Sequence, residues 1–149
     1  FENNLAEELI HISAVHSYFW IEDESQRIGT NMLPITFFKN MRNSICYFID
    51  IPFDARLQFI VQAYGKFAVA DLIAATLRIQ KRLGGLETKT AVNFLVENNI
   101  EGAFSILLKY YDKVYLKNIE AAAIPKFKTE KIVASEVHSI HNAGLIMHL

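Results

Sequence analysis

The stretch ICYFIDIPFDARLQFIVQAYG, Ile45–Gly65, decides the fold class of this chain. Its first part, Ile45–Ile51, is a short apolar run, and such runs are typical of a strand buried on both faces of a parallel sheet. Pro52 ends the run, Asp54 is placed to cap the next helix, and that helix stops near Gly65. A buried strand followed at once by a helix predicts an α/β layered fold.

Further elements lie on both sides of this unit. Aromatic and β-branched residues predict a strand over Val15–Ile21, and a third strand is expected near Ile132–His138. Helices are expected over Glu2–His11 and just after Pro34. Beyond Gly65 the pattern is helical, with apolar faces formed by Val69, Leu72, Ile73, Thr76, Ile79 and Leu83, and by Phe104, Leu107, Leu108, Tyr111 and Tyr115.

The expected architecture is therefore a partial parallel sheet of about three strands with a largely helical C-terminal half. The chain begins without Met and inside a helical pattern, so we interpret residues 1–149 as one truncated domain. Within it we expect an α/β part over residues 1–66, a helical part over 67–122, and a C-terminal strand and helix over 123–149.

Composition excludes several classes of protein. The formal net charge of -1 gives no bulk attraction to nucleic acid or membrane, so any basic surface must be local. No apolar stretch reaches the roughly 18 residues of a membrane-spanning helix. The single cysteine, Cys46, excludes an internal disulfide and is consistent with a cytoplasmic location. It lies in the apolar run, where we expect a protonated, inert thiol.

Three consecutive acids follow the predicted strand Val15–Ile21: Glu22, Asp23 and Glu24. A strand that ends in carboxylates is typical of a Walker B element, which orients Mg²⁺ near a nucleotide phosphate. The matching phosphate loop, GxxxxGK[ST], is absent from the sequence. From the acids alone, a solvated turn is the favoured interpretation.

Other chemistry is sparse. His138 and His141 have no companion ligands for a metal, and Ser25 lacks the G-x-S-x-G context of a nucleophile. We therefore expect neither a metal site nor a catalytic residue in this chain.

Two basic stripes stand out in the helical part. Lys109, Lys113 and Lys117 repeat every four residues with Tyr110 beside them, and Arg78 and Arg82 repeat the spacing with Lys81 alongside. Like charges at that spacing repel by about 0.2–0.5 kcal/mol per pair. The stripes indicate either a polyanion surface, where Tyr110 stacks on a base, or two ordinary solvated faces that Asp112 and Glu120 partly offset. Charge alone leaves both open.

Several motifs in order resemble the C-terminal part of the bacterial tRNA 2-selenouridine synthase family. They are FENNLAEEL, FWIEDESQRIG, YFIDIPFDARLQFIVQAYG, LRIQKRLGG and LLKYYDKVY, between Phe1 and Ile119. The resemblance implies a partial P-loop-type domain that follows a rhodanese-like module carrying the catalytic cysteine. This chain has neither that module nor the phosphate loop, so we expect it to be inactive alone.

The resemblance also implies a transferase reaction. In that family the sulfur of wobble 2-thiouridine in tRNA is replaced by selenium from selenophosphate, through a geranylated intermediate made with geranyl diphosphate. The implied partners are tRNA and the rhodanese-like module, with no membrane. We expect no firmly bound cofactor, and nucleotide and Mg²⁺ binding stay open.

Roles carry over only to matching positions. The resemblance implies that Glu22, Asp23, Glu24, Ser25, Arg27 and Gly29 face a phosphate or cation site, and that Arg56 contacts phosphate. It also marks the turn at Arg82, Gly84 and Gly85, and the group Tyr110, Tyr111 and Asp112. Candidate RNA-binding residues are Arg78, Lys81, Arg82, Lys109, Tyr110, Lys113 and Lys117.

Two alternatives remain. The chain can be part of a P-loop small-molecule kinase, in which the acids hold Mg²⁺ and Arg56 contacts the transferred phosphate. It can also be a non-enzymatic helical module whose apolar faces meet a partner protein.

Overall fold

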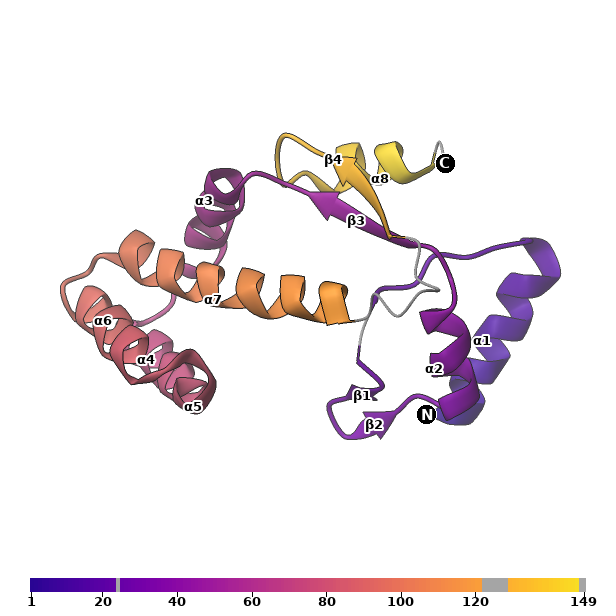
Figure 1. The fold of residues 1–149 in the computed structure, drawn as a ribbon, viewed down its shortest axis with the longest axis horizontal. Coiled ribbons are helices and arrows are strands. Elements are labelled where there is room, and N and C mark those ends of the chain that lie inside the picture. The colour runs from indigo at the N-terminus through magenta and orange to yellow at the C-terminus, as the bar shows by residue number, and fades with distance from the viewer. Residues whose placement is uncertain (24, 122–128, 148–149) are drawn as a thin grey trace. The chain divides into compact units, whose positions relative to one another are not determined.

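A computed structural model describes residues 1–23, 25–121 and 129–147 (Figure 1). Its elements are α1 (Glu2–Val15), β1 (Arg27–Ile28), β2 (Asn31–Met32), α2 (Ile35–Arg42), β3 (Cys46–Asp50), α3 (Phe53–Tyr64), α4 (Val69–Arg78), α5 (Gln80–Leu83), α6 (Gly85–Val96), α7 (Ile100–Ala121), β4 (Thr129–Val133) and α8 (Ser139–Met147). The expected α/β class is confirmed.

The chain divides into two compact units. The first comprises Phe1–Cys46 with Ile124–Glu130, and the second comprises Tyr47–Ala123 with Lys131–Leu149.

In the first unit, the predicted strand Val15–Ile21 is wrong. Helix α1 continues to Val15, and the following residues to Asp23 have no regular secondary structure. Tyr18, Phe19 and Trp20 are exposed there, with Tyr18 66% exposed. Aromatic and β-branched residues fit a pleated surface only where neighbouring strands cover them, so the local preference does not make a strand by itself.

A small hairpin follows. Strands β1 and β2 pair antiparallel, with Arg27 opposite Met32 and Ile28 opposite Asn31. The two-residue connection begins with Gly29 at φ +62°, a conformation that such turns require and that glycine adopts without steric cost. The predicted helix after Pro34 is confirmed as α2, with Pro34 at its N-cap position.

The second unit contains the predicted strand and helix of the opening stretch. Strand β3 pairs in parallel with β4, and the backbone N–H of Ala134 donates to the carbonyl of Asp50 at 3.0 Å. The sheet has two strands rather than three, so β3 is half-buried along its length instead of fully enclosed. Pro52, not Asp54, occupies the N-cap of α3, and Asp54 lies in the first turn.

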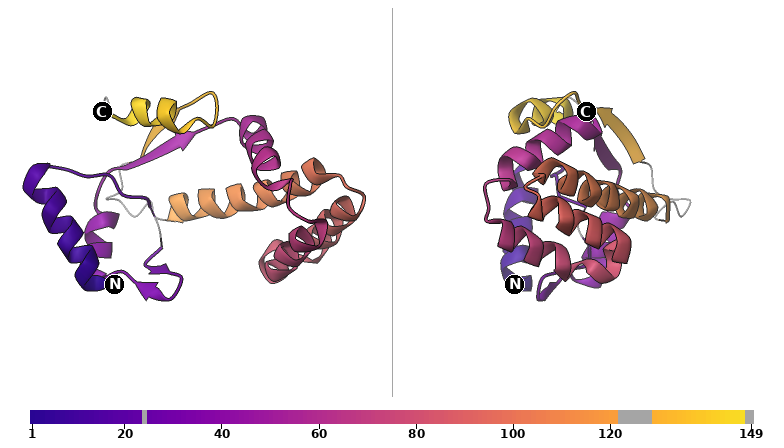
Figure 2. Two further views of the ribbon diagram at one scale, coloured as in Figure 1. Left: turned by 180° about the vertical axis from the view of Figure 1, so that it is seen from behind. Right: turned by 90° about the vertical axis from the view of Figure 1, so that its left-hand side faces the viewer.

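The core of the second unit lies among α3, α6 and α7. Leu57, Leu95, Ala103 and Phe104 are buried together there. Full burial of a side chain such as Leu or Phe contributes about 1.5–3 kcal/mol. Figure 2 shows α4 and α6 side by side next to one end of α7, as the contacts of α6 with both helices require.

Two tight turns separate these helices. Gly84, between α5 and α6, has φ +103° and ψ 154°, a backbone conformation almost confined to glycine. Asn98 adopts φ +59° before α7, and the side chain of Asn99 accepts a hydrogen bond from the backbone N–H of Gly102 at 2.9 Å. These turns allow α6 and α7 to pack against each other.

The predicted apolar face of α7 is only partly correct. Phe104 is buried and Leu107 and Leu108 are half-buried, but Tyr111 and Tyr115 are 49% and 59% exposed. The periodicity continues along the helix, whereas the packing does not extend as far as those two tyrosines.

Candidate functional site

The lysine stripe lies on the second half of α7. Lys109, Lys113 and Lys117 are all exposed, and Tyr110 beside them is half-buried. Within the described residues, no ion pair joins any of these lysines to an acid. The stripe therefore presents its positive charge to solvent.

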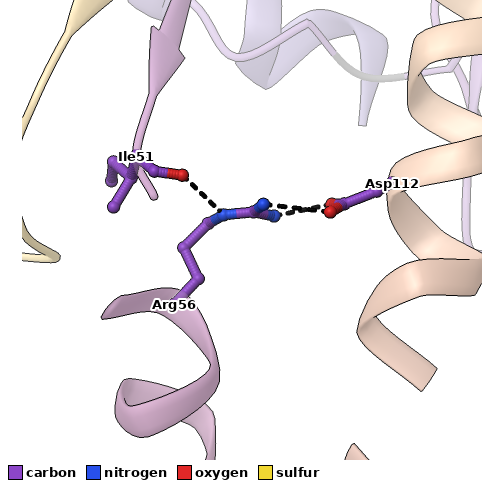
Figure 3. Close-up of polar contacts among 3 residues, drawn as sticks. All are labelled: Ile51, Arg56 and Asp112. Atoms are coloured by element: carbon purple, nitrogen blue, oxygen red, sulfur yellow. Dashed lines mark hydrogen bonds and ion pairs between the residues drawn. The ribbon is translucent and has the colours of Figure 1, made fainter. Parts of the chain in front are cut away.

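Asp112, the acid within this stripe, is bound elsewhere. Its two carboxylate oxygens accept hydrogen bonds from the Nη1 and Nη2 atoms of Arg56, at 2.6 and 2.9 Å (Figure 3). The Nε–H of Arg56 donates to the carbonyl of Ile51 at 2.9 Å. Asp112 thus forms its ion pair with α3 instead of offsetting the lysines as the sequence suggested.

The pair is partly shielded from solvent. The Arg56 and Asp112 side chains are 30% and 31% exposed. The hydrogen bonds to Asp112 are the main cause that raises the pKa of Arg56 above its ordinary value. Burial lowers this pKa, and the charges of Asp112 and Asp50 add smaller increases. A bidentate pair of this kind fixes the plane of the guanidinium.

An aromatic ring lies beneath both cations of this region. The Arg56 guanidinium carbon and the Lys109 Nζ each lie 5.9 Å from the centroid of the Phe53 ring. Cations at about 6 Å from a ring face are attracted by its quadrupole. Phe53 packs against the core and is the first residue of α3, so α3 supplies the ring and Arg56 while α7 supplies Lys109.

The second basic stripe lies where α4 meets α5. Arg78 is in the last turn of α4, and Lys81 and Arg82 are in the last turn of α5. All three are exposed, and cations at helix C-termini are favoured by the helix dipole. This position gives the three residues a structural reason to be basic, independent of any ligand.

The acidic motif does not end a strand. Asp23 forms an ion pair with Arg42 at 2.7 Å, and Glu22 is exposed, while Glu24 lies outside the described residues. The Ser25 hydroxyl donates to the Arg27 carbonyl at 2.7 Å, and Arg27 Nε donates to the Gly29 carbonyl at 3.2 Å. Ser25 and Arg27 therefore support the hairpin, whereas Asp23 binds α2. The role of these residues toward a phosphate or cation stays a prediction.

Potential metal ligands lie apart from one another. In the part of the chain that the structure describes, no three His, Cys, Asp or Glu side chains come together. His138 caps α8, because its Nδ1 accepts a hydrogen bond from the backbone N–H of His141 at 3.2 Å.

The environment of Cys46 agrees with an inert thiol. Burial is the main cause that raises its pKa above the ordinary value of 9.0, and the charge of Asp23 adds to it. The charge of Arg42, four residues earlier, lowers the pKa of Cys46 but has the smallest effect of the three.

Sequence reasoning missed the roles of Phe53 and Asp112. Arg56 and Asp112 belong to different helices and are far apart in the chain, so no spacing rule connects them. One signal was present, because Asp112 is the only acid between Glu101 and Glu120 and interrupts a basic stretch.

Among the described residues, the structure contains no helix long and apolar enough to cross a membrane.

Comparison with known proteins identifies the family of this chain. The sequence model of the family described as the tRNA 2-selenouridine synthase AAA domain matches residues 1–139. The chain belongs to this family, and the resemblance drawn from its motifs is confirmed. The match ends at Ser139, where α8 begins.

Individual relatives carry a more particular name. Proteins named tRNA 2-selenouridine synthase from Shewanella frigidimarina, Shewanella piezotolerans and Psychromonas ingrahamii are 30%, 29% and 28% identical to this chain. The alignments cover 80%, 83% and 83% of the chain, but only 41%, 42% and 42% of the three relatives. The chain thus spans about two-fifths of the length of these relatives. No solved structure matches it significantly.

Proposed function

We propose that this chain is part of a tRNA-modifying transferase and contributes a surface that binds tRNA and phosphate-bearing ligands. One observation carries the proposal. The lysine stripe of α7 is exposed and has no acidic partner among the described residues, because Asp112 is bound to Arg56. Three lysines that repel one another and have no acidic partner among the described residues favour a polyanion at this face.

The names of the relatives suggest the reaction. We propose that the enzyme replaces the sulfur of wobble 2-thiouridine with selenium from selenophosphate, through a geranylated intermediate formed with geranyl diphosphate. Both cosubstrates carry phosphate groups, which bind most readily to arginine and lysine side chains. Cys46 is unsuited to nucleophilic attack, so the catalytic cysteine would belong to a rhodanese-like module of the same enzyme in the cytoplasm.

The test is a charge-reversal variant. We expect Lys109→Glu, Lys113→Glu and Lys117→Glu together to lower tRNA affinity by at least about 100-fold at low salt, since each lysine would neutralise roughly one phosphate. The measurement is equilibrium binding of labelled tRNA by the chain, with circular dichroism to confirm that α7 is retained.

A matched control separates the stripe from net charge. Lys39→Glu, Lys66→Glu and Lys89→Glu change the net charge equally, and all three lysines are exposed on other parts of the chain. We expect the control to keep most of the affinity. Equal losses in both triple variants would contradict a tRNA surface on α7.

A further inference from the structure

Arg56 and Lys109 come from different helices but converge on one aromatic ring. Arg56 belongs to the first turns of α3 and Lys109 to the middle of α7, and each cation lies 5.9 Å from the centre of the Phe53 ring. Asp112 is one helical turn beyond Lys109 and holds the guanidinium of Arg56. Two cations therefore lie over the Phe53 ring, and one carboxylate binds one of them.

The local charge balance leaves a positive excess. Asp50, the other acid that acts on Arg56, is itself paired with Lys131 at 2.7 Å. Asp112 neutralises Arg56, while Lys109 has no acidic partner among the described residues. The cluster at the end of β3 is thus one positive charge in excess.

The hydrogen-bonding capacity of Arg56 is also incompletely used. A guanidinium has five N–H donors, and three of them are directed at Ile51 and Asp112. The side chain remains 30% exposed, so an anion in solvent can reach it. Phosphate and carboxylate match the same fork of donors, which makes a phosphate a direct competitor of Asp112.

We propose that Arg56 and Lys109, held against the Phe53 ring, form one phosphate-binding site, and that Asp112 occupies Arg56 until a phosphate group replaces it. The ligand is either a free diphosphate compound or a phosphate of the RNA backbone. This inference deepens the proposed function and rests on it for the choice of ligands, but it is tested independently of tRNA binding.

The first experiment is titration calorimetry of the chain with inorganic pyrophosphate at low ionic strength. We expect Lys109→Gln and Arg56→Gln each to weaken pyrophosphate binding about tenfold, because each removes a charged donor. Lys113→Gln is the matched control, since it lies one turn farther along the same stripe and has no cation–π contact with Phe53 among the described residues. Equal weakening of pyrophosphate binding by Lys109→Gln and Lys113→Gln would contradict the proposed site.

The competing carboxylate is tested by Asp112→Asn. Removal of its charge should strengthen pyrophosphate binding several-fold, because the ligand no longer displaces an anion. Weaker binding by Asp112→Asn would show that Asp112 supports the site rather than competes for it.

One measurement follows binding in the unaltered chain and uses a variant only for assignment. The Arg56 Nε–H signal in a ¹⁵N-labelled chain, assigned by its loss in Arg56→Lys, should shift when pyrophosphate is added. A signal that stays unchanged at saturating pyrophosphate would refute the proposal whatever the variants do.

Two arms distinguish the sources of phosphate and separate the inference from the proposed function. If tRNA displaces pyrophosphate, the site takes an RNA phosphate, and if both bind together, it takes a free diphosphate.

Lys113→Glu with Lys117→Glu leaves the Phe53 site intact. Loss of tRNA binding in that variant supports the proposed function, and unchanged binding refutes the tRNA surface while the pyrophosphate site still stands.

Discussion

At the scale of single residues, the chemistry of the second unit depends on which groups are already paired. Arg56 is bound on two sides, by the Ile51 carbonyl and by Asp112, whereas Lys109 contacts only an aromatic ring among the described groups. These two cations thus differ in how available they are to a ligand. The sequence contains both residues but carries no information on this difference.

Cys46 allows a direct test of its environment. We expect iodoacetamide at about pH 8 to react more slowly with Cys46 in the folded chain than in the chain unfolded by urea, because burial lowers the thiolate fraction. Since the pKa is raised in the folded state, folding is most favoured below 9.0, and that contribution is lost as the pH rises through the folded-state pKa. The measurement is alkylation rate against pH.

Equal alkylation rates in the folded and unfolded chains would contradict this environment of Cys46.

The inert thiol was predictable from the apolar run around Cys46, because burial is the larger effect. The opposing influences of Asp23 and Arg42 were not, since they depend on how the segment after α1 approaches α2.

At the scale of elements, periodicity predicted helices well and strands less well. The strand at Ile45–Ile51 and the helix after it form as expected, because Pro52 and Gly65 define their limits locally. The segment Val15–Ile21 has the composition of a strand but pairs with no strand among the described residues, because pairing depends on distant parts of the chain. The sequence therefore could not show whether the three acids after that segment end a strand, as they would in a Walker B element.

The turn between α5 and α6 gives a prediction about glycine. Gly84→Ala should destabilise the chain by about 1–3 kcal/mol, because its φ of +103° is strained for any side chain. An added Cβ would also lie 2.7 Å from the Glu87 carboxylate, which would have to move. The measurement is urea unfolding followed by circular dichroism.

The adjacent glycine is the matched control. Gly85 begins α6, and a Cβ there would meet nothing within 4 Å. Gly85→Ala should therefore stabilise the chain by about 0.4–1 kcal/mol, since the unfolded state loses freedom. Destabilisation by both substitutions to the same extent would argue against the backbone assignment of Gly84.

At the scale of the whole molecule, the net charge is negative whereas the local charge of the α7 lysine stripe is positive. The chain has a formal net charge of -1, so a polyanion is not attracted in bulk and must meet a local basic surface. The family could be predicted from the motifs and their order. The ion pair of Asp112 with Arg56, which removes Asp112 as a partner of the α7 lysines, could be found only in the three-dimensional structure.

Salt dependence tests this local surface. For the unaltered chain we expect the logarithm of tRNA affinity to fall linearly with the logarithm of salt concentration. Replacement of Lys109, Lys113 and Lys117 by Gln should reduce the slope by about 2–3, because each lost phosphate contact contributes roughly 0.7–0.9. A slope that does not change would place the RNA contacts elsewhere on the chain.

The parallel pairing of β3 with β4 has a consequence for the order of folding. Asp50 and Ala134, which share a backbone hydrogen bond, flank the helices from α3 to α7 in the chain. Closing so long a loop costs conformational entropy before the strands gain any contact, whereas the helices form from local contacts. The helical core should therefore form first and the sheet last, and amide hydrogens of β4 should exchange faster than those of α6.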